Sequence, residues 1–284
     1  MRTYKYWAKW STSVDTPSGK WLLSHFGSSN ESAEDAARDA RLKVERVKEL
    51  VLGGGRADSY EYSDRPLREE VKREIYQHDE LAAVITRNSY GSLVLNTARV
   101  MFIDIDTAPE DGVGVGPGFL GRLLGKRPTA QSKAAGSYIH IDEFRRKAEA
   151  HGVGMRVYRT PNGYRCLVTD RLFDPVSEEA FALLRAFGSD ELYVRLCRVQ
   201  ECFRARLTPK PWRIDMVAPR SHYPWAEREL ELEHREWERD YERRIQAYSA
   251  CSFLGHCGNE AVMDDIAEIV KIHDALACTG KPLA

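Results

Sequence analysis

Long apolar segments are missing from this sequence of 284 residues. No uninterrupted apolar run approaches the roughly 18 residues that a membrane-spanning helix requires. The first residues, Met-Arg-Thr-Tyr-Lys-Tyr-Trp, contain no apolar core of the kind found in signal peptides. We therefore expect a cytoplasmic protein that has no membrane partner.

An excess of charge of one sign is also missing, because 42 basic and 43 acidic residues give a net charge of -1. No overall electrostatic field attracts nucleic acid, so any site for a polyanion has to be a local patch. With 43% hydrophobic and 30% charged residues, the composition is that of an ordinary soluble globular protein. The chain is long enough for one large domain or two modest ones.

The sequence has few cysteines that are spaced as zinc ligands usually are. Cys197 and Cys202 are separated by four residues and Cys251 and Cys257 by five, which is an unusual spacing for zinc knuckles, although His256 adjoins Cys257. This spacing disfavours a structural zinc and favours buried thiols, which a cytoplasmic protein keeps reduced.

Glycine fingerprints for phosphate binding are missing as well. Residues 107–137 contain seven glycines and three prolines, but they form neither GxxxxGK[ST] nor a strand-GxGxxG-helix pattern. A loop of this length is usually functional or disordered. We interpret the stretch as a Gly-rich insert, either a mobile lid beside a site or a plain surface insertion.

The patterns that are present predict an α+β fold. Hairpins are expected over residues 3–26, 81–96 and 155–168, and helices over 36–52, 66–76, 139–151, 178–187, 190–200, 226–248 and 262–276. We divide the chain into an N-terminal hairpin and helices packed on the core (1–80), a catalytic-type α+β core that includes the insert (81–220) and a helical C-terminal region (221–284).

The most informative stretch is 99–106, an apolar run that ends in two carboxylates one residue apart. Residues 100–103 predict a buried strand, and residues i and i+2 of a strand point to the same side. Asp104 and Asp106 therefore project together. Two such carboxylates repel each other unless a cation lies between them, and hard oxygen ligands suit Mg²⁺ or Mn²⁺. Alternatively, one aspartate caps the following turn and the other is solvated.

A local basic patch lies further along the chain. Residues 195–220 contain two acidic and seven basic residues, namely Arg195, Arg198, Arg204, Arg206, Lys210, Arg213 and Arg220. A predicted hairpin turn with a glycine, residues 159–165, lies between the aspartate pair and this patch. Nucleotidyl transfer needs such a set, because carboxylates hold cations that neutralise phosphate charge while Arg and Lys stabilise the leaving pyrophosphate.

Three elements resemble, in order, the motifs of the archaeo-eukaryotic primase superfamily. They are Phe102-Ile-Asp104-Ile-Asp106, Thr160-Pro-Asn-Gly-Tyr-Arg165 and Ile214-Asp215, and the similarity covers roughly residues 82–217. The resemblance implies an RRM-like core and two-metal nucleotidyl transfer, with Asp104, Asp106 and Asp215 as catalytic metal ligands. Arg165 stands where the family has a histidine.

The same resemblance and the basic patch imply a nucleotide site and its partners, a nucleoside triphosphate and DNA or RNA. The phosphate-binding residues would be Arg159, Thr160, Gly163, Arg165, Arg204, Arg206, Lys210 and Arg213.

Two other interpretations stay open. One is a metal-independent RNA- or DNA-binding module that uses the basic patch, with Phe203 and Trp212 interleaved for base stacking. The other is a phosphatase of the haloacid dehalogenase type, which also carries Asp-x-Asp after an apolar strand. That family has Thr or Val two residues beyond the second aspartate, where this chain has Ala108.

Overall fold

The computed structural model describes residues 1–17, 19–54, 66–107 and 130–284, with backbone alone for 130–140. Within these residues the fold is α+β, with six α-helices and ten strands in three antiparallel sheets. The expected fold class is therefore confirmed. None of the helices in these ranges is long and apolar enough to cross a membrane.

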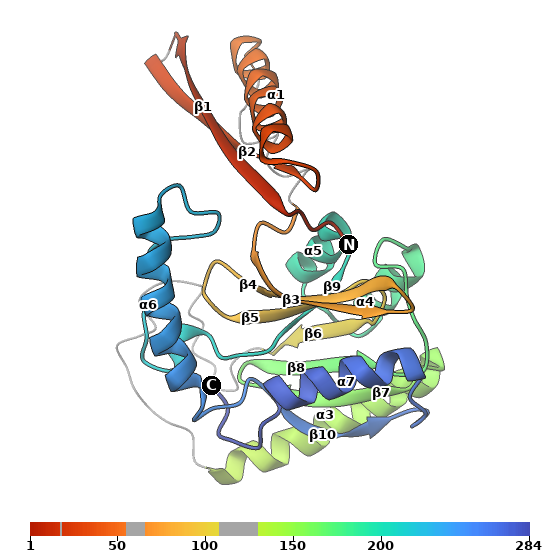
Figure 1. Cartoon of the computed structure of the whole chain (residues 1–284). Coiled ribbons are helices and arrows are strands. Elements are labelled where there is room, and N and C mark those ends of the chain that lie inside the picture. The colour runs from red at the N-terminus through yellow and green to blue at the C-terminus, as the bar shows by residue number, and fades with distance from the viewer. Residues whose placement is uncertain (18, 55–65, 108–129) are drawn as a thin grey trace.

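The N-terminal unit is a long hairpin covered by one helix (Figure 1). Strands β1 (Tyr6–Thr16) and β2 (Gly19–Ser29) pair antiparallel, and α1 (Ala33–Leu52) packs on one face of them. Ser32 starts the helix because its hydroxyl accepts the backbone N–H of Asp35 at 3.0 Å. The unit has a small core of its own, formed by Val14, Leu23, Val44 and Val47.

One four-stranded sheet has the order β3-β4-β5-β9. Its strands are β3 (Glu70–Gln77), β4 (Glu80–Arg87), β5 (Leu93–Thr97) and β9 (Phe203–Arg206). The helix expected over residues 66–76 is wrong, because β3 occupies most of that stretch. Charged residues of high helix propensity lie there on an edge strand, and pairing with β4 overrides that propensity.

The other four-stranded sheet has the order β10-β7-β8-β6. Its strands are β6 (Phe102–Asp106), β7 (Met155–Thr160), β8 (Gly163–Val168) and β10 (Ser252–Cys257). The predicted buried strand and second hairpin are confirmed. The RRM-like arrangement is not confirmed. The C-terminal region is not purely helical, because its strand β10 completes this sheet beside β7.

Helices cover both faces of the second sheet. On one face, Phe144 of α3 (Ala130–His151) packs against Tyr164, with ring centroids 5.2 Å apart. On the other face, His273 of α7 (Asp264–Ala277) packs against Phe102 at 5.4 Å. Because helices cover both faces, every residue of the strand before the aspartate pair faces the core. Met101, Phe102 and Ile103 are accordingly apolar and fully buried.

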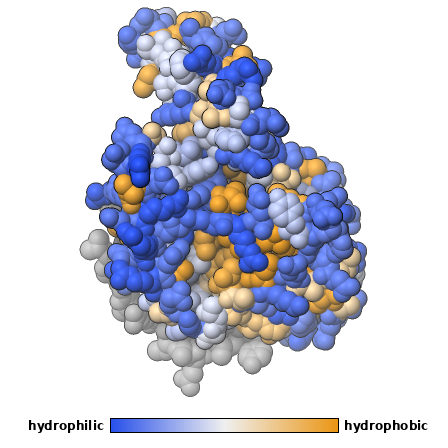
Figure 2. All heavy atoms as spheres, in the orientation of Figure 1, coloured by the Kyte–Doolittle hydropathy of each residue, from blue (hydrophilic) through white to orange (hydrophobic). Residues whose placement is uncertain are grey.

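Three further helices lie where the sequence predicts them: α4 (Glu178–Ala186), α5 (Glu191–Gln200) and α6 (Arg228–Ile245). Residues 108–129 of the expected Gly-rich insert lie outside the described residues, and 130–137 form the start of α3. Figure 2 shows hydrophilic side chains over α6 and hydrophobic ones near the centre of the body.

Candidate functional site at the end of strand β6

The pairing of β6 with β8 brings two of the predicted elements together. Asp104 lies opposite Arg165, and Asp106 lies opposite Gly163. Directly opposed residues share one face of a sheet, so Arg165 Nε donates to Asp104 Oδ1 at 3.1 Å. The guanidinium of Arg165 is buried and also donates to the carbonyl of Arg206 at 2.7 Å. Arg165 therefore joins the aspartate strand to β9.

The two aspartates differ in environment. Asp104 is half-buried and held by Arg165, whereas Asp106 lies at the exposed end of the strand. Partial burial of its carboxyl group, followed by repulsion from Asp104 and Asp190, raises the pKa of Asp106. Asp190 also caps α5, where its Oδ1 accepts the backbone N–H of Tyr193 at 2.9 Å. A carboxylate that two others repel is a site where a bound cation is favourable.

Three cations of the predicted basic patch, Arg206, Lys210 and Arg213, interact electrostatically with this pair. Burial, followed by repulsion from Arg206 and Arg213, lowers the pKa of Lys210 to about 8, while Asp106 and Asp104 oppose that shift. Burial also lowers the pKa values of Arg206 and Arg213. Within the described part of the chain, these three side chains form no ion pair or hydrogen bond. Cations in such an environment favour an anionic ligand.

Arg204, which sequence reasoning placed with these cations, has a different position. Its side chain is largely buried, and its guanidinium donates to both carboxylate oxygens of Glu69 at 2.6 and 2.8 Å and to Gln200 at 2.8 Å. Phe203 beside it is fully buried in the core. Successive residues of a strand point to opposite sides, so Arg204 shares a face of β9 with Arg206. Arg204 is nevertheless paired with Glu69 and is not one of the cations without an ion pair among the described residues.

The remaining hairpin residues support the sheet. Arg159 lies opposite Tyr164, on the face away from Asp104, and its guanidinium sits 4.7 Å from the Tyr164 ring centroid. Thr160 is buried. Gly163 is required by close packing, because a Cβ there would lie 2.0 Å from the carbonyl oxygen of Ile105. Of the expected phosphate contacts in this hairpin, the structure brings only Arg165 to the charged cluster.

The third expected metal ligand is not brought to the pair. Asp215 is exposed with a left-handed φ of 56°, and its carbonyl accepts a hydrogen bond from Arg244 at 3.3 Å. The described residues include no group of three His, Cys, Asp or Glu placed to hold a metal. Asp104 and Asp106 alone still fit Mg²⁺ or Mn²⁺, since such ions bind one or two carboxylates together with substrate phosphates.

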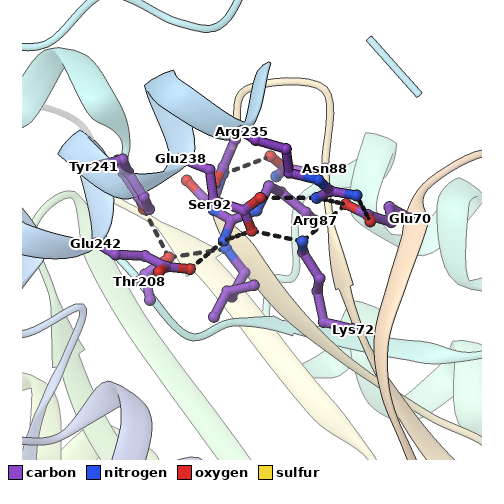
Figure 3. Close-up of polar contacts among 12 residues, drawn as sticks. Glu70, Lys72, Arg87, Asn88, Ser92, Thr208, Arg235, Glu238, Tyr241 and Glu242 are labelled. Carbon is purple, nitrogen blue, oxygen red and sulfur yellow. Dashed lines mark hydrogen bonds and ion pairs between the residues drawn. The ribbon is translucent and has the colours of Figure 1, made fainter. Parts of the chain in front are cut away.

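A buried ion-pair network joins α6 to β3 and β4 (Figure 3). Arg87 is almost fully buried and donates to Glu238 at 2.7 Å, to Glu242 at 2.9 Å and to the carbonyl of Gly91 at 2.6 Å. Burial by itself would raise the pKa of Glu238, but hydrogen bonds from Lys72 and Arg235 lower it to about 2. The many charged residues of α6 suggest a solvent-exposed helix. In the structure, Glu238 is instead buried and forms ion pairs with Arg87, Lys72 and Arg235.

The same helix fixes the segment that leads to Lys210. The Tyr241 hydroxyl contacts the carbonyl of Pro209 at 2.6 Å and Thr208 Oγ1 at 2.7 Å. Ser92 donates to the same Pro209 carbonyl at 3.0 Å. Sequence reasoning missed these residues, because no local signal relates α6 to a segment some thirty residues away.

The candidate site therefore consists of Asp104, Asp106, Arg165, Arg206, Lys210 and Arg213, supported by Asp190 and Tyr241. No protein-family model, curated protein or solved structure matches the chain.

Proposed function

We propose that the protein is a divalent-metal-dependent nucleotidyltransferase that acts on a nucleoside triphosphate and nucleic acid. The observation that carries the proposal is the cluster at the end of β6, where Asp104 and Asp106 interact electrostatically with three cations that form no ion pair of their own within the ranges that the structure describes. A metal polyphosphate presents positive charge to Asp104 and Asp106 and negative charge to the basic residues, so it complements both halves of the site.

Each group has a role that follows from its charge and contacts. Asp104 and Asp106 would hold Mg²⁺ or Mn²⁺, which neutralises phosphate charge and activates an attacking hydroxyl. Arg206, Lys210 and Arg213 bind phosphate oxygens and stabilise the pyrophosphate that leaves. Arg165 keeps Asp104 oriented through its hydrogen bond at 3.1 Å. If the resemblance holds, Arg165 would stand where the primase superfamily has a histidine.

Product analysis tests this function against the phosphatase interpretation. The protein is incubated with Mn²⁺, nucleoside triphosphates and a primed or unprimed DNA template, and pyrophosphate, orthophosphate and extended strands are measured. Nucleotidyl transfer releases pyrophosphate and extends a strand, whereas a phosphatase releases orthophosphate alone.

Variants connect the product to the site. Asp106→Asn should abolish pyrophosphate release, while Glu260→Gln, which alters an exposed carboxylate after β10, should not. Pyrophosphate release that persists in Asp106→Asn would reject the assignment. A protein that binds nucleic acid without metal, loses affinity steeply with salt and releases neither phosphate product would instead be the binding module.

A further inference from the structure

Two exposed aromatic rings form a pair beside the charged cluster. Trp212, in the short 3-10 helix η2 (Pro211–Arg213), and Tyr90, in the turn between β4 and β5, are 39% and 49% exposed. Their ring centroids lie 5.3 Å apart at an interplanar angle of 82°, an edge-to-face contact. The two residues are 122 positions apart in the sequence, so only the fold reveals the pair.

The rings are continuous with the proposed phosphate site. The Lys210 ammonium lies 5.3 Å from the Trp212 ring centroid, and Arg213 follows Trp212 directly. Lys210 also interacts electrostatically with Asp106 and Asp104. From the carboxylates outward, the order is therefore carboxylate pair, cations, aromatic pair.

Both rings are carried by backbone that the α6 network holds in place. Arg87 donates to the carbonyl of Gly91, next to Tyr90, while Tyr241 donates to the carbonyl of Pro209 ahead of Trp212. Gly91 itself lies against Trp237, because a Cβ there would come within 2.0 Å of that indole. Exposed rings on a fixed backbone form a preorganised surface, which lowers the entropic cost of binding.

We propose that Trp212 and Tyr90 form a stacking platform for a nucleobase whose phosphates contact Lys210 and Arg213. Aromatic faces next to a basic groove are the arrangement by which proteins bind single-stranded nucleic acid, since every base offers a π-face. The platform rests on the proposed function for its phosphate site and extends it to the base. The base belongs either to the bound nucleoside triphosphate or to a single strand of nucleic acid.

Titration calorimetry with three probes tests the platform. The probes are inorganic tripolyphosphate, ATP and a short single-stranded oligodeoxynucleotide, each with Mn²⁺, and the proteins are the wild type, Trp212→Ala and Trp212→Phe. Loss of one stacked base should weaken binding of ATP, of the oligonucleotide or of both by about 5- to 150-fold in Trp212→Ala. Tripolyphosphate has no base, so its affinity should stay the same.

The other variants separate stacking from folding. Trp212→Phe should recover most of the lost affinity, Tyr90→Ala should weaken the same probe, and Trp21→Ala, which alters a 42% exposed indole on β2, should change nothing. The probe that loses affinity identifies the source of the base. Unchanged affinities for both base-containing probes in Trp212→Ala, or an equal loss for tripolyphosphate, would overturn the platform.

Binding of the three probes to the wild type shows whether the stacking platform alone or also the proposed function is rejected. If tripolyphosphate binds and ATP and the oligonucleotide bind no more tightly, the phosphate site stands and the platform is rejected. If none of the three probes binds, both proposals are rejected.

Discussion

Arg165 gives Asp104 a permanent counter-ion inside the sheet. An arginine stays charged at every accessible pH, and its planar guanidinium can contact Asp104 and the Arg206 carbonyl at once. A histidine at this position would change charge near neutral pH, so the arginine makes the orientation of Asp104 independent of pH. Asp106, whose carboxylate has no such partner among the described residues, is then the group most open to a metal.

Lys210 should make ligand binding depend on pH. Its pKa is lowered to about 8, and only the charged ammonium attracts phosphate. Tripolyphosphate affinity should therefore be highest below pH 8 and fall as the pH rises through 8. Lys210→Arg should remove most of this decrease, because the replacement stays charged over the whole range.

Calorimetric titration of tripolyphosphate between pH 7 and pH 9 checks this expectation. An affinity of the wild type that is flat over this range, or equally pH-dependent in Lys210→Arg, would show that Lys210 does not contact the anion.

Among the elements, α6 holds two segments in place, namely the turn between β4 and β5, which carries Tyr90, and the segment that includes η2, which carries Lys210 and Trp212. Its Glu238 is 7% exposed and lies between Arg87, Lys72 and Arg235. Breaking a buried pair leaves an uncompensated charge, which is much more costly than removing a surface pair. The network is therefore expected to affect both stability and the position of the site.

Glu238 should make stability fall in acid. Its folded pKa of about 2 lies below the ordinary value of 4.5, so its contribution is fully present above pH 4.5 and is lost as the pH falls through 2. The shift corresponds to roughly 3 kcal/mol. Glu238→Gln should lose a comparable part of its stability at pH 7 and show a shallower decrease between pH 5 and pH 2.

Urea unfolding at several pH values measures this difference, with Glu236→Gln on the exposed side of α6 as the matched control. Equal pH profiles for the wild type and Glu238→Gln would contradict the assignment of this carboxylate to the network.

Elements with strong local signals were predictable from the sequence. The strand that carries Asp104, the hairpin that carries Arg165 and the helix after Ser32 each depend on adjacent residues. Strands β3 and β10 were not, because charged residues of high helix propensity dominate β3 and a glycine interrupts β10. Pairing with β4 and β7 makes them strands.

The candidate site was predictable only in part, because some of its contacts join residues that are far apart in the sequence. The cations Arg206, Lys210 and Arg213 were found from their local density, but the position of Arg204 against Glu69 depends on residues 135 positions apart. Tyr90 resembles an ordinary turn residue until the fold places it against Trp212.

In the molecule as a whole, the N-terminal unit is separate from the body that carries the site. Its core of Val14, Leu23, Val44 and Val47 is distinct from the main core, and α1 contacts chiefly β1 and β2. In Figure 1 it projects beyond the two four-stranded sheets. A small core stabilises weakly, so this unit should open more readily than the body.

Hydrogen exchange tests this separation. Backbone amides of β1, β2 and α1 should exchange through openings of lower free energy than those of β6 and β8. Val44→Ala should speed exchange in the N-terminal unit by removing buried methyl groups, at a cost of about 1 to 3 kcal/mol. Its ATP affinity should equal that of the wild type. Faster exchange spread evenly over β6 and β8 would instead show one cooperative core.

The aspartate pair and the three cations Arg206, Lys210 and Arg213 are proposed to form one site for a metal polyphosphate. The most direct test is the thermal unfolding midpoint with Mn²⁺ alone, ATP alone and both together, for the wild type, Asp106→Asn and the double variant Asp104→Asn with Asp106→Asn. A ligand at about 100 times its dissociation constant adds roughly 2.7 kcal/mol to the stability of the folded state. We predict a rise of roughly 5 °C that requires Mn²⁺ and ATP together and disappears in both variants. No rise in the wild type, or a rise of equal size in the variants, would contradict a shared metal-polyphosphate site at Asp104 and Asp106.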